Sequence, residues 1–116
     1  MILEPTVESP ALARAYCDGV LDSSGSNDRF EDARLVVSEL VTNAILHAGT
    51  DIEVIVVVRS DAVRIEVTDL GGGVPSSRPV EGTTSGRGLP IVEALGGQWG
   101  VLQLGAGKTV WCELTR

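Results

Sequence analysis

Residues 39 to 43 read Glu39-Leu40-Val41-Thr42-Asn43, and this short stretch decides how the rest of the chain is interpreted. It places a carboxylate and a carboxamide four residues apart within a helical pattern of apolar residues. At roughly 100° per residue the two polar side chains lie about 40° apart, so both stand at one margin of the apolar stripe. Such a pair in isolation is more often a solvated helix edge, so its meaning depends on the motifs that follow.

Three glycine-containing elements follow this helix along the chain. The first, Asp69 to Gly73, comes at the end of a strand pattern. The second, Gly86-Arg87-Gly88-Leu89, opens a helical pattern, and the third, Gly107-Lys108-Thr109, lies between two late strand patterns. In this order the elements indicate a nucleotide site built on a helix and a sheet.

The composition is that of a single acidic domain. A chain of 116 residues is long enough for one core and too short for two, so residues 1–116 are expected to form one domain. The net charge is -7 and the nine basic residues are scattered, which leaves no basic stripe to neutralise phosphates. Nucleic acid and anionic membranes are therefore not expected as partners.

The two cysteines, Cys17 and Cys112, lie far apart in apolar contexts. We interpret them as small buried residues in a reducing compartment, with a disulfide as the alternative; their spacing fits no zinc site. No apolar run approaches the length of a membrane span, and the N-terminus shows no signal-peptide pattern. The expected location is the cytoplasm.

Apolar periodicity predicts the helices and strands. Helical spacing occurs from Pro10 to about Leu21 and again up to about His47, with Asp28 and Glu31 as a candidate capping box at the start of the second helix. A short helix is expected over residues 89–95. Strands are expected over residues 52–58, which look largely buried on both faces, and over 63–69, 98–104 and 108–114.

The order of these elements predicts a two-layer α/β sandwich. Its mixed, mostly antiparallel sheet would be covered on one face by about three helices. Residues 70 to 85 have no periodicity and are rich in Gly, Pro, Ser and Thr, so they are a candidate lid beside a site.

Asp69 shares its parity with Val63, Ile65 and Val67, so its side chain is expected on the helix-covered face of the sheet. A carboxylate without a partner is costly to bury, and it can accept a hydrogen bond from an exocyclic amine such as that of adenine. An Asp that caps a turn before glycines is an equally common alternative.

The helical pair and the second glycine element have chemistry that suits phosphates. The Asn43 oxygen is a hard ligand of the kind that Mg²⁺ prefers, and the Glu39 carboxylate can polarise an attacking hydroxyl or water. Backbone N–H groups at the start of the helix after Gly86 can meet an anion, and Arg87 can add a charge-assisted bond or lie on the surface. We interpret His47 as a structural residue near the helix end and not as a catalytic one.

In this order and spacing the four segments resemble the GHKL (Bergerat-fold) ATPases, the superfamily of gyrase B, MutL and the catalytic domains of sensor histidine kinases. Within it, the chain is most similar to the small bacterial anti-sigma-factor serine kinases. Residues 37–44 with His47-Ala48 resemble their N box, and residues 69–73, 86–92 and 107–111 resemble their three glycine boxes. The resemblance covers nearly the whole chain from about residue 10.

The resemblance implies a role for each matching residue. Glu39 would be the general base, Asn43 the Mg²⁺ ligand and Asp69 the adenine acceptor. The other expected contacts with ATP are Gly71 and Gly73 at the base, Gly86, Arg87, Gly88 and Leu89 at the phosphates, and Thr109 at the adenine end.

The resemblance also implies a regulatory serine kinase that transfers the γ-phosphate of ATP to an anti-anti-sigma partner and sequesters a sigma factor. Sensor kinases more often have Asn at the position of Glu39, which favours a serine acceptor over a histidine. Leu70, Ser85 and Pro90 depart from the family pattern, and they favour the alternative of a nucleotide-binding interaction module with little or no kinase activity. A plain structural α/β domain is a third interpretation, and a homodimer is possible.

Overall fold

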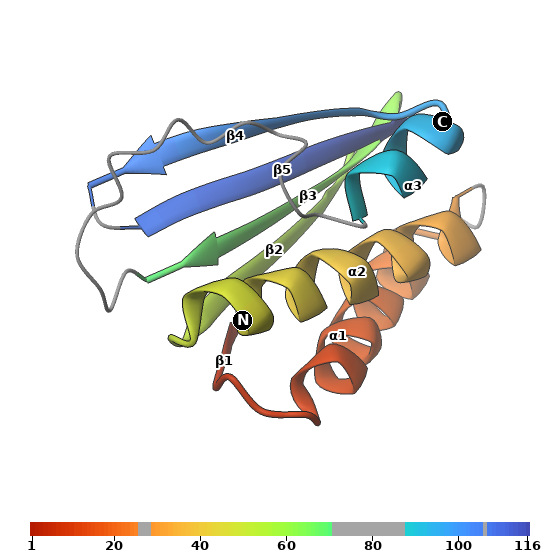
Figure 1. The fold of residues 1–116 in the computed structure, drawn as a ribbon. Helices are drawn as coiled ribbons and strands as arrows, with labels where there is room; N and C mark the ends of the chain where they lie inside the picture. Colours follow the sequence, from red (N-terminus) through yellow and green to blue (C-terminus); the bar gives the residue numbers. More distant parts are fainter. Residues whose placement is uncertain (26–28, 71–87, 106) are drawn as a thin grey trace.

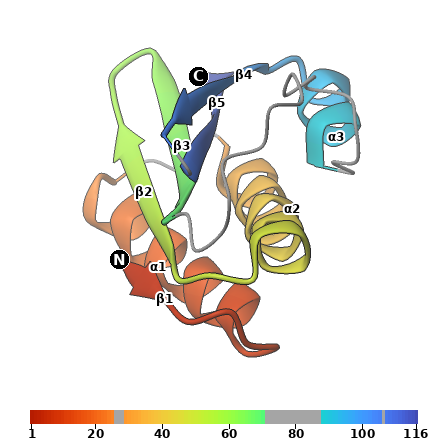
Figure 2. The same cartoon turned by 60° about the vertical axis from the view of Figure 1, so that its left-hand side comes forward.

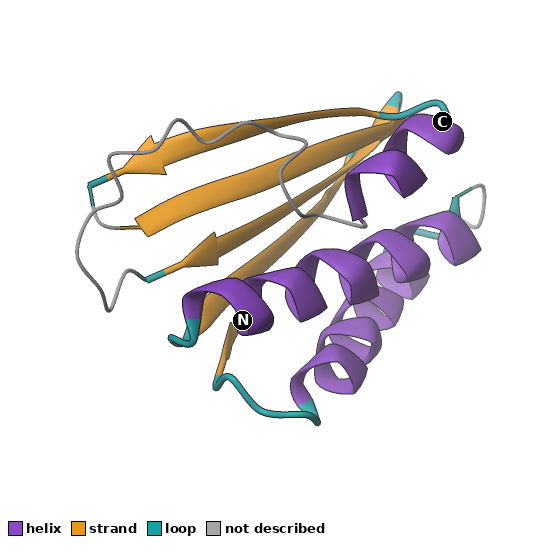
Figure 3. Ribbon diagram, viewed as in Figure 1, coloured by secondary structure: helices purple, strands orange, loops and turns teal. Residues whose placement is uncertain are grey.

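The computed structural model describes residues 1–25, 29–70, 88–105 and 107–116. All helices of this part of the chain lie on one side of a single sheet (Figures 1 and 3). The elements follow the chain as β1 (Ile2–Leu3), α1 (Ser9–Ser23), α2 (Phe30–Ala48), β2 (Ile52–Val58), β3 (Ala62–Asp69), α3 (Gly88–Ala94), β4 (Gln98–Leu104) and β5 (Gly107–Thr115). They closely match the elements expected from periodicity. No helix of the described ranges has the length and apolar character needed to cross a bilayer.

The sheet has the order β1-β2-β3-β5-β4, and every pairing among the described strands is antiparallel. The expected two-layer α/β sandwich is therefore confirmed, but the expectation of a mixed sheet is wrong for the described strands. Two of these pairings, β2–β3 and β4–β5, must be antiparallel because each pair is joined by a short connection, which parallel neighbours do not allow.

The core lies between the two layers. In α1 the buried residues Ala13, Cys17 and Leu21 recur every fourth position, and in α2 the buried stripe includes Val37 and Val41. Aliphatic side chains from the inner face of β2, β3 and β5 meet these helices. Figure 2 shows α2 between α1 and α3, so α2 is the helix whose two flanks both have helical neighbours.

The beginning and end of α2 differ in how they are fixed. Gly49 ends the helix in the left-handed region, with φ of 66°, and its N–H donates to the carbonyl of Ile45. At the other end Arg29 is the N-cap, and no described side chain forms a cap hydrogen bond there. The capping box expected at Asp28 and Glu31 stays a prediction, because Asp28 lies outside the described residues.

The outer face of the sheet has no helical layer among the described residues. Val57 is 39% exposed there, and its neighbours Glu53 and Ile55 are half-buried, so the expectation that β2 is buried on both faces is wrong. On the same face Arg64 forms ion pairs with Glu66 (2.7 Å) and Glu113 (2.9 Å) and lies 4.6 Å from the ring centroid of Trp111. The hydrogen bond to Glu66 is the main cause that raises the pKa of Arg64.

Both cysteines are free thiols buried in the core, as the sequence predicted for their packing. Burial is the main cause that raises the pKa of Cys17 to about 11 and that of Cys112 to about 12. Both thiols are therefore neutral in the folded protein at physiological pH.

We expect alkaline pH to destabilise the fold through these thiols. Above the ordinary thiol pKa of 9.0 the unfolded chain loses its thiol protons while the folded chain keeps them. The free energy of unfolding should thus fall from about pH 9 up to the folded pKa values, by about 1.4 kcal/mol per pH unit for each thiol. Urea titrations at several pH values measure this slope, and Cys17→Ala should reduce it by one thiol's share. An unchanged slope in that variant would contradict the assignment.

The turn that follows α3 is packed tightly against β5. Gly96 adopts a φ of 75°, and the N–H of Gly97 donates to the carbonyl of Val92 over 2.9 Å. A Cβ on Gly97 would stand 2.9 Å from both the carbonyl oxygen of Glu113 and Cδ2 of Leu114. The backbone can approach β5 this closely only because residue 97 has no side chain.

We expect Gly97→Ala to destabilise the protein by about 1–3 kcal/mol, because the added carbon meets backbone that cannot yield. Gly19→Ala is the matched control: it lies within α1, and a Cβ there meets nothing within 4 Å. That change should stabilise the fold by about 0.5–1 kcal/mol. Thermal unfolding of the two variants gives the comparison, and similar effects of the same sign would refute the tight packing of the turn after α3 against β5.

Candidate functional site

Asp69 is the most unusual residue of the described chain. It ends β3 on the inner face, as its parity predicted, and is 7% exposed. Its carboxylate has no hydrogen bond or ion pair among the described residues. A carboxylate in this position can accept a hydrogen bond from a ligand that supplies a donor.

The register of the sheet places Asp69 beside the end of α2. Its partner on β2 is Ile52, which follows the last residue of α2 by only four positions. The N–H of Leu70 donates to the carbonyl of Asp51 over 3.2 Å and so ties the end of β3 to the connection that leaves α2. The inner acid and the C-terminal half of α2 thereby belong to one region.

The register of β5 determines which of its residues lies opposite Asp69. Lys108 pairs with Asp69, whereas Thr109 pairs with Thr68, and the two threonine hydroxyl oxygens lie 2.7 Å apart. Because directly opposed residues share a face, Thr109 lies on the outer face and does not share the face of Asp69. Lys108, and not Thr109, is therefore directly opposite Asp69, and the expected contact of Thr109 with the adenine end stays a prediction.

The backbone of Gly107 lies so close to Asp69 that no side chain fits at residue 107. A Cβ on Gly107 would stand 2.5 Å from the backbone oxygen of Asp69 and 3.4 Å from one of its carboxylate oxygens. Any other residue would displace Asp69. The glycine of the third glycine element thus has a steric function at the site.

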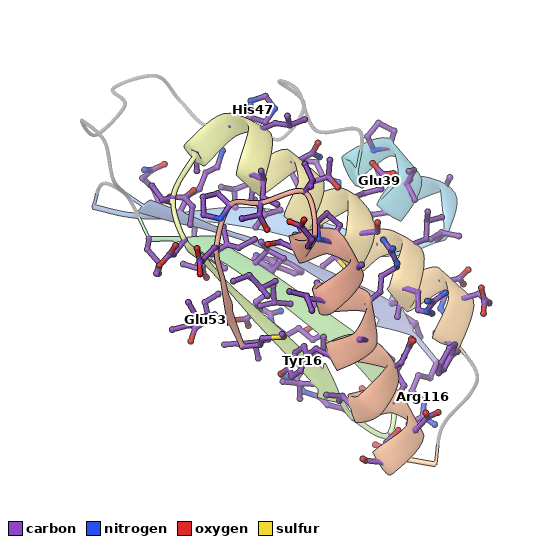
Figure 4. The ribbon with its side chains drawn as sticks, turned by 90° about the horizontal axis from the view of Figure 1, so that it is seen from below. Tyr16, Glu39, His47, Glu53 and Arg116 are labelled. Atoms are coloured by element: carbon purple, nitrogen blue, oxygen red, sulfur yellow. The ribbon has the colours of Figure 1, made fainter. Side chains whose placement is uncertain are left out.

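Glu39 and Asn43 lie on one flank of α2, one turn apart, and both are half-buried. Figure 4 shows Glu39 beside α3 and His47 further along α2. Neither Glu39 nor Asn43 has a hydrogen bond within the described residues. His47 is exposed in the last turn of the helix.

The short helix α3 is attached to the first turn of α2. Arg29 donates to the carbonyl of Leu95 over 2.7 Å and forms an ion pair with Asp32 at 3.0 Å. The C-terminal end of α3 is thus fixed next to the N-terminus of α2, and Gly88 and Leu89 form its other end. α2 contacts both β3, which ends at Asp69, and α3, so it connects the two ends of the candidate site.

Four of the expected site residues, Gly71, Gly73, Gly86 and Arg87, lie outside the described residues, as does most of the candidate lid. The structure does bring Glu39, Asn43 and Asp69 to the same side of the sheet and places Gly88 and Leu89 at the start of α3. The roles assigned to all these residues remain predictions. Lys108, directly opposite Asp69 in the sheet, is the residue that the sequence analysis did not consider.

A family model described as "Histidine kinase-, DNA gyrase B-, and HSP90-like ATPase" matches residues 29–116. No curated protein matches the chain in sequence. The similar solved structures include the histidine kinase domain of the Erythrobacter litoralis EL346 blue-light activated histidine kinase, with a TM-score of 0.59 and 22% identity over 90% of this chain and 59% of that one.

A longer structure of the same Erythrobacter litoralis kinase matches with a TM-score of 0.58 and 21% identity, over 90% of this chain and 44% of that one. The catalytic domain of histidine kinase ThkA, in a nucleotide-free form, matches with a TM-score of 0.52 and 15% identity, over 99% of this chain and 94% of that one. At these identities the likeness shows the fold. The chain spans 59% and 44% of the two Erythrobacter litoralis structures.

We expect Asp69→Asn to stabilise the protein in the absence of any ligand, by about 1 kcal/mol, because no described residue donates to the carboxylate and a neutral amide is cheaper to bury than a charge. Asp51→Asn serves as the control, since Asp51 is exposed and lies beside the same strand end. Urea unfolding measures both. A loss of stability in Asp69→Asn would show that the carboxylate has a structural partner.

Proposed function

Because the chain belongs to the histidine kinase-, DNA gyrase B-, and HSP90-like ATPase family, we propose that it is a regulatory protein serine kinase of the anti-sigma-factor type. The family match makes it a GHKL-type, kinase-like ATP-binding domain. The serine acceptor, the magnesium ion and the protein partners are our proposal. The observation that supports nucleotide binding is the buried carboxylate of Asp69 at the end of β3, for which no described residue is a hydrogen-bond or ion-pair partner.

The proposal assigns adenine to the Asp69 end of the site. The exocyclic amine of adenine donates to the carboxylate and so replaces the water that burial removed. Gly107 keeps this end open, as the close approach of its backbone to Asp69 indicates. Gly71 and Gly73 would lie next to the base, as the resemblance of the first glycine element implies.

The proposal assigns the phosphates to the middle of α2. Among the described residues no three His, Cys, Asp or Glu side chains gather to hold a metal by themselves. Mg²⁺ commonly keeps several waters and takes one or two protein oxygens plus substrate phosphates. The side-chain oxygen of Asn43 suits this arrangement, with Gly86, Arg87, Gly88 and Leu89 expected at the phosphates.

The carboxylate of Glu39 favours a serine acceptor. As the serine oxygen forms its bond to the γ-phosphorus and the bond to the leaving ADP oxygen breaks, Glu39 accepts the hydroxyl proton. An asparagine at this position has no site for that proton. The half-buried position of Glu39 on the flank of α2 leaves it within reach of a partner's side chain.

We further propose that the acceptor is a serine of an anti-anti-sigma protein and that the chain sequesters a sigma factor, with a homodimer as the possible assembly. This rests on the resemblance of the N box around Glu39 and Asn43. The alternative is a nucleotide-binding interaction module with little or no kinase activity. Pro90 favours it, because a proline in the first turn of α3 removes one backbone donor near the phosphates.

The kinase test uses Mg-ATP and a candidate antagonist protein, with phosphoserine measured by mass spectrometry. We expect Glu39→Gln to bind ATP with nearly unchanged affinity and to transfer phosphate about 10²–10⁴ times more slowly, because only the proton acceptor is lost. Undiminished transfer in Glu39→Gln would refute the base assignment. Calorimetry with ATP and ADP, with and without magnesium, supplies the affinities.

The same titrations separate the two candidate functions. Asp69→Asn should bind ATP at least tenfold more weakly than the wild type, since it loses a charged acceptor. Tight binding of ATP by the wild type with no transfer to any antagonist would favour the interaction module. Equal affinities of the wild type and Asp69→Asn would remove the adenine assignment.

A further inference from the structure

Lys108 stands directly across from Asp69 in the β3–β5 register. Opposed residues of antiparallel strands share a face, with Cβ atoms about 4.5–5.5 Å apart. The inner face at the end of the sheet thus presents a carboxylate and an ammonium group side by side. Lys108 is the only lysine in the chain, the other basic residues being arginines.

Within the described residues, neither Asp69 nor Lys108 forms an ion pair. The ion pairs in this part of the chain are all formed by arginines, and none of them joins Lys108 to Asp69. Lys108 is half-buried, so its aliphatic stem packs while its charged end can reach a ligand. A cation and an anion placed side by side in this way form a donor–acceptor pair for the edge of a ligand.

We propose that Lys108 is the second base-recognition residue of the nucleotide site and determines its preference for adenine; this rests on the ATP binding proposed above. Asp69 accepts a hydrogen bond from the N6 amine of adenine, and the Lys108 ammonium donates one to the adjacent ring nitrogen N1. Both bonds involve a charged protein group, and such bonds are the stronger kind.

The same pair rejects guanine. In the same orientation guanine presents its O6 acceptor to the Asp69 carboxylate and its N1–H donor to the Lys108 ammonium. An acceptor then faces an acceptor and a donor faces a donor, so neither hydrogen bond can form. Because buried polar groups left without partners are costly, guanine should bind much more weakly than adenine. Asp69 alone would not exclude guanine, because its carboxylate could accept hydrogen bonds from the N1–H and the N2 amine of a guanine bound in a shifted position.

The first experiment compares nucleotides by calorimetry in the wild type and Lys108→Met. ATP and its 1-deaza analogue, in which N1 is replaced by C–H, are the matched ligands. The wild type should bind 1-deaza-ATP about ten- to a hundredfold more weakly than ATP, whereas Lys108→Met should bind both with similar, reduced affinity. The preference of the variant for ATP over GTP should also fall.

Two controls distinguish base recognition from a general effect of charge and from a contact with the phosphates. Arg59→Met removes one positive charge from an exposed residue at the opposite end of the β2–β3 pair, and it should bind ATP as the wild type does. Adenosine tests where Lys108 acts: a loss of ATP affinity with unchanged adenosine affinity would assign Lys108 to the phosphates and overturn the proposal. So would equal ATP affinity of Lys108→Met and the wild type.

The second experiment needs no variant. Limited acetylation of the wild-type protein followed by mass spectrometry reports on one lysine, with the amino group of Met1 as an internal reference. Adenosine should slow acetylation of Lys108 several-fold and leave Met1 unchanged. Adenosine that binds without protecting Lys108 overturns this proposal alone, whereas absence of any ATP binding overturns the proposed function as well.

Discussion

The register of β3 between β2 and β5 is the constraint on which the rest of the structure depends. Side chains alternate between the two faces of a strand, so the pairing that buries Val63, Ile65 and Val67 also turns Asp69 inward. A slip of one residue would reverse every side chain and put Thr68 in that place. The aliphatic core therefore sets the position of the functional acid, and no separate interaction has to do so.

The inner charges differ from the ion-paired ones around Arg64 on the outer face. The Asp69 carboxylate is 7% exposed and has no donor among the described residues, and no described residue forms an ion pair with the neighbouring Lys108. Functional sites are where proteins keep groups that the fold alone would not select. The paired charges of Arg64 on the outer face show the opposite situation, in which each charge already has a partner.

Much of the fold could be predicted from the sequence because it rests on periodicity. The alternation that ends at Asp69 predicted its inner position, and the helical spacing around Glu39 predicted α2. Thr109 was assigned to the adenine end from a glycine motif, not from strand parity. Counting back by twos from the buried Cys112 through Val110 reaches Lys108, so the parity signal was present in the sequence. Gly71, Gly73, Gly86 and Arg87 belong to a stretch without periodicity, where no packing pattern fixes the backbone.

The contact between Arg29 and Leu95 links the two helices that flank the site. Arg29 sits at the N-cap of α2, and its guanidinium holds both the Leu95 carbonyl at the end of α3 and the Asp32 carboxylate. These two contacts hold its guanidinium, while its Nε is buried and has no hydrogen-bond partner among the described residues. A movement of the C-terminal end of α3 would therefore be transmitted through Arg29 to the first turn of α2. Glu39 lies on the same helix, about three turns further along. The position of α3 and the position of Glu39 are thus coupled through one side chain.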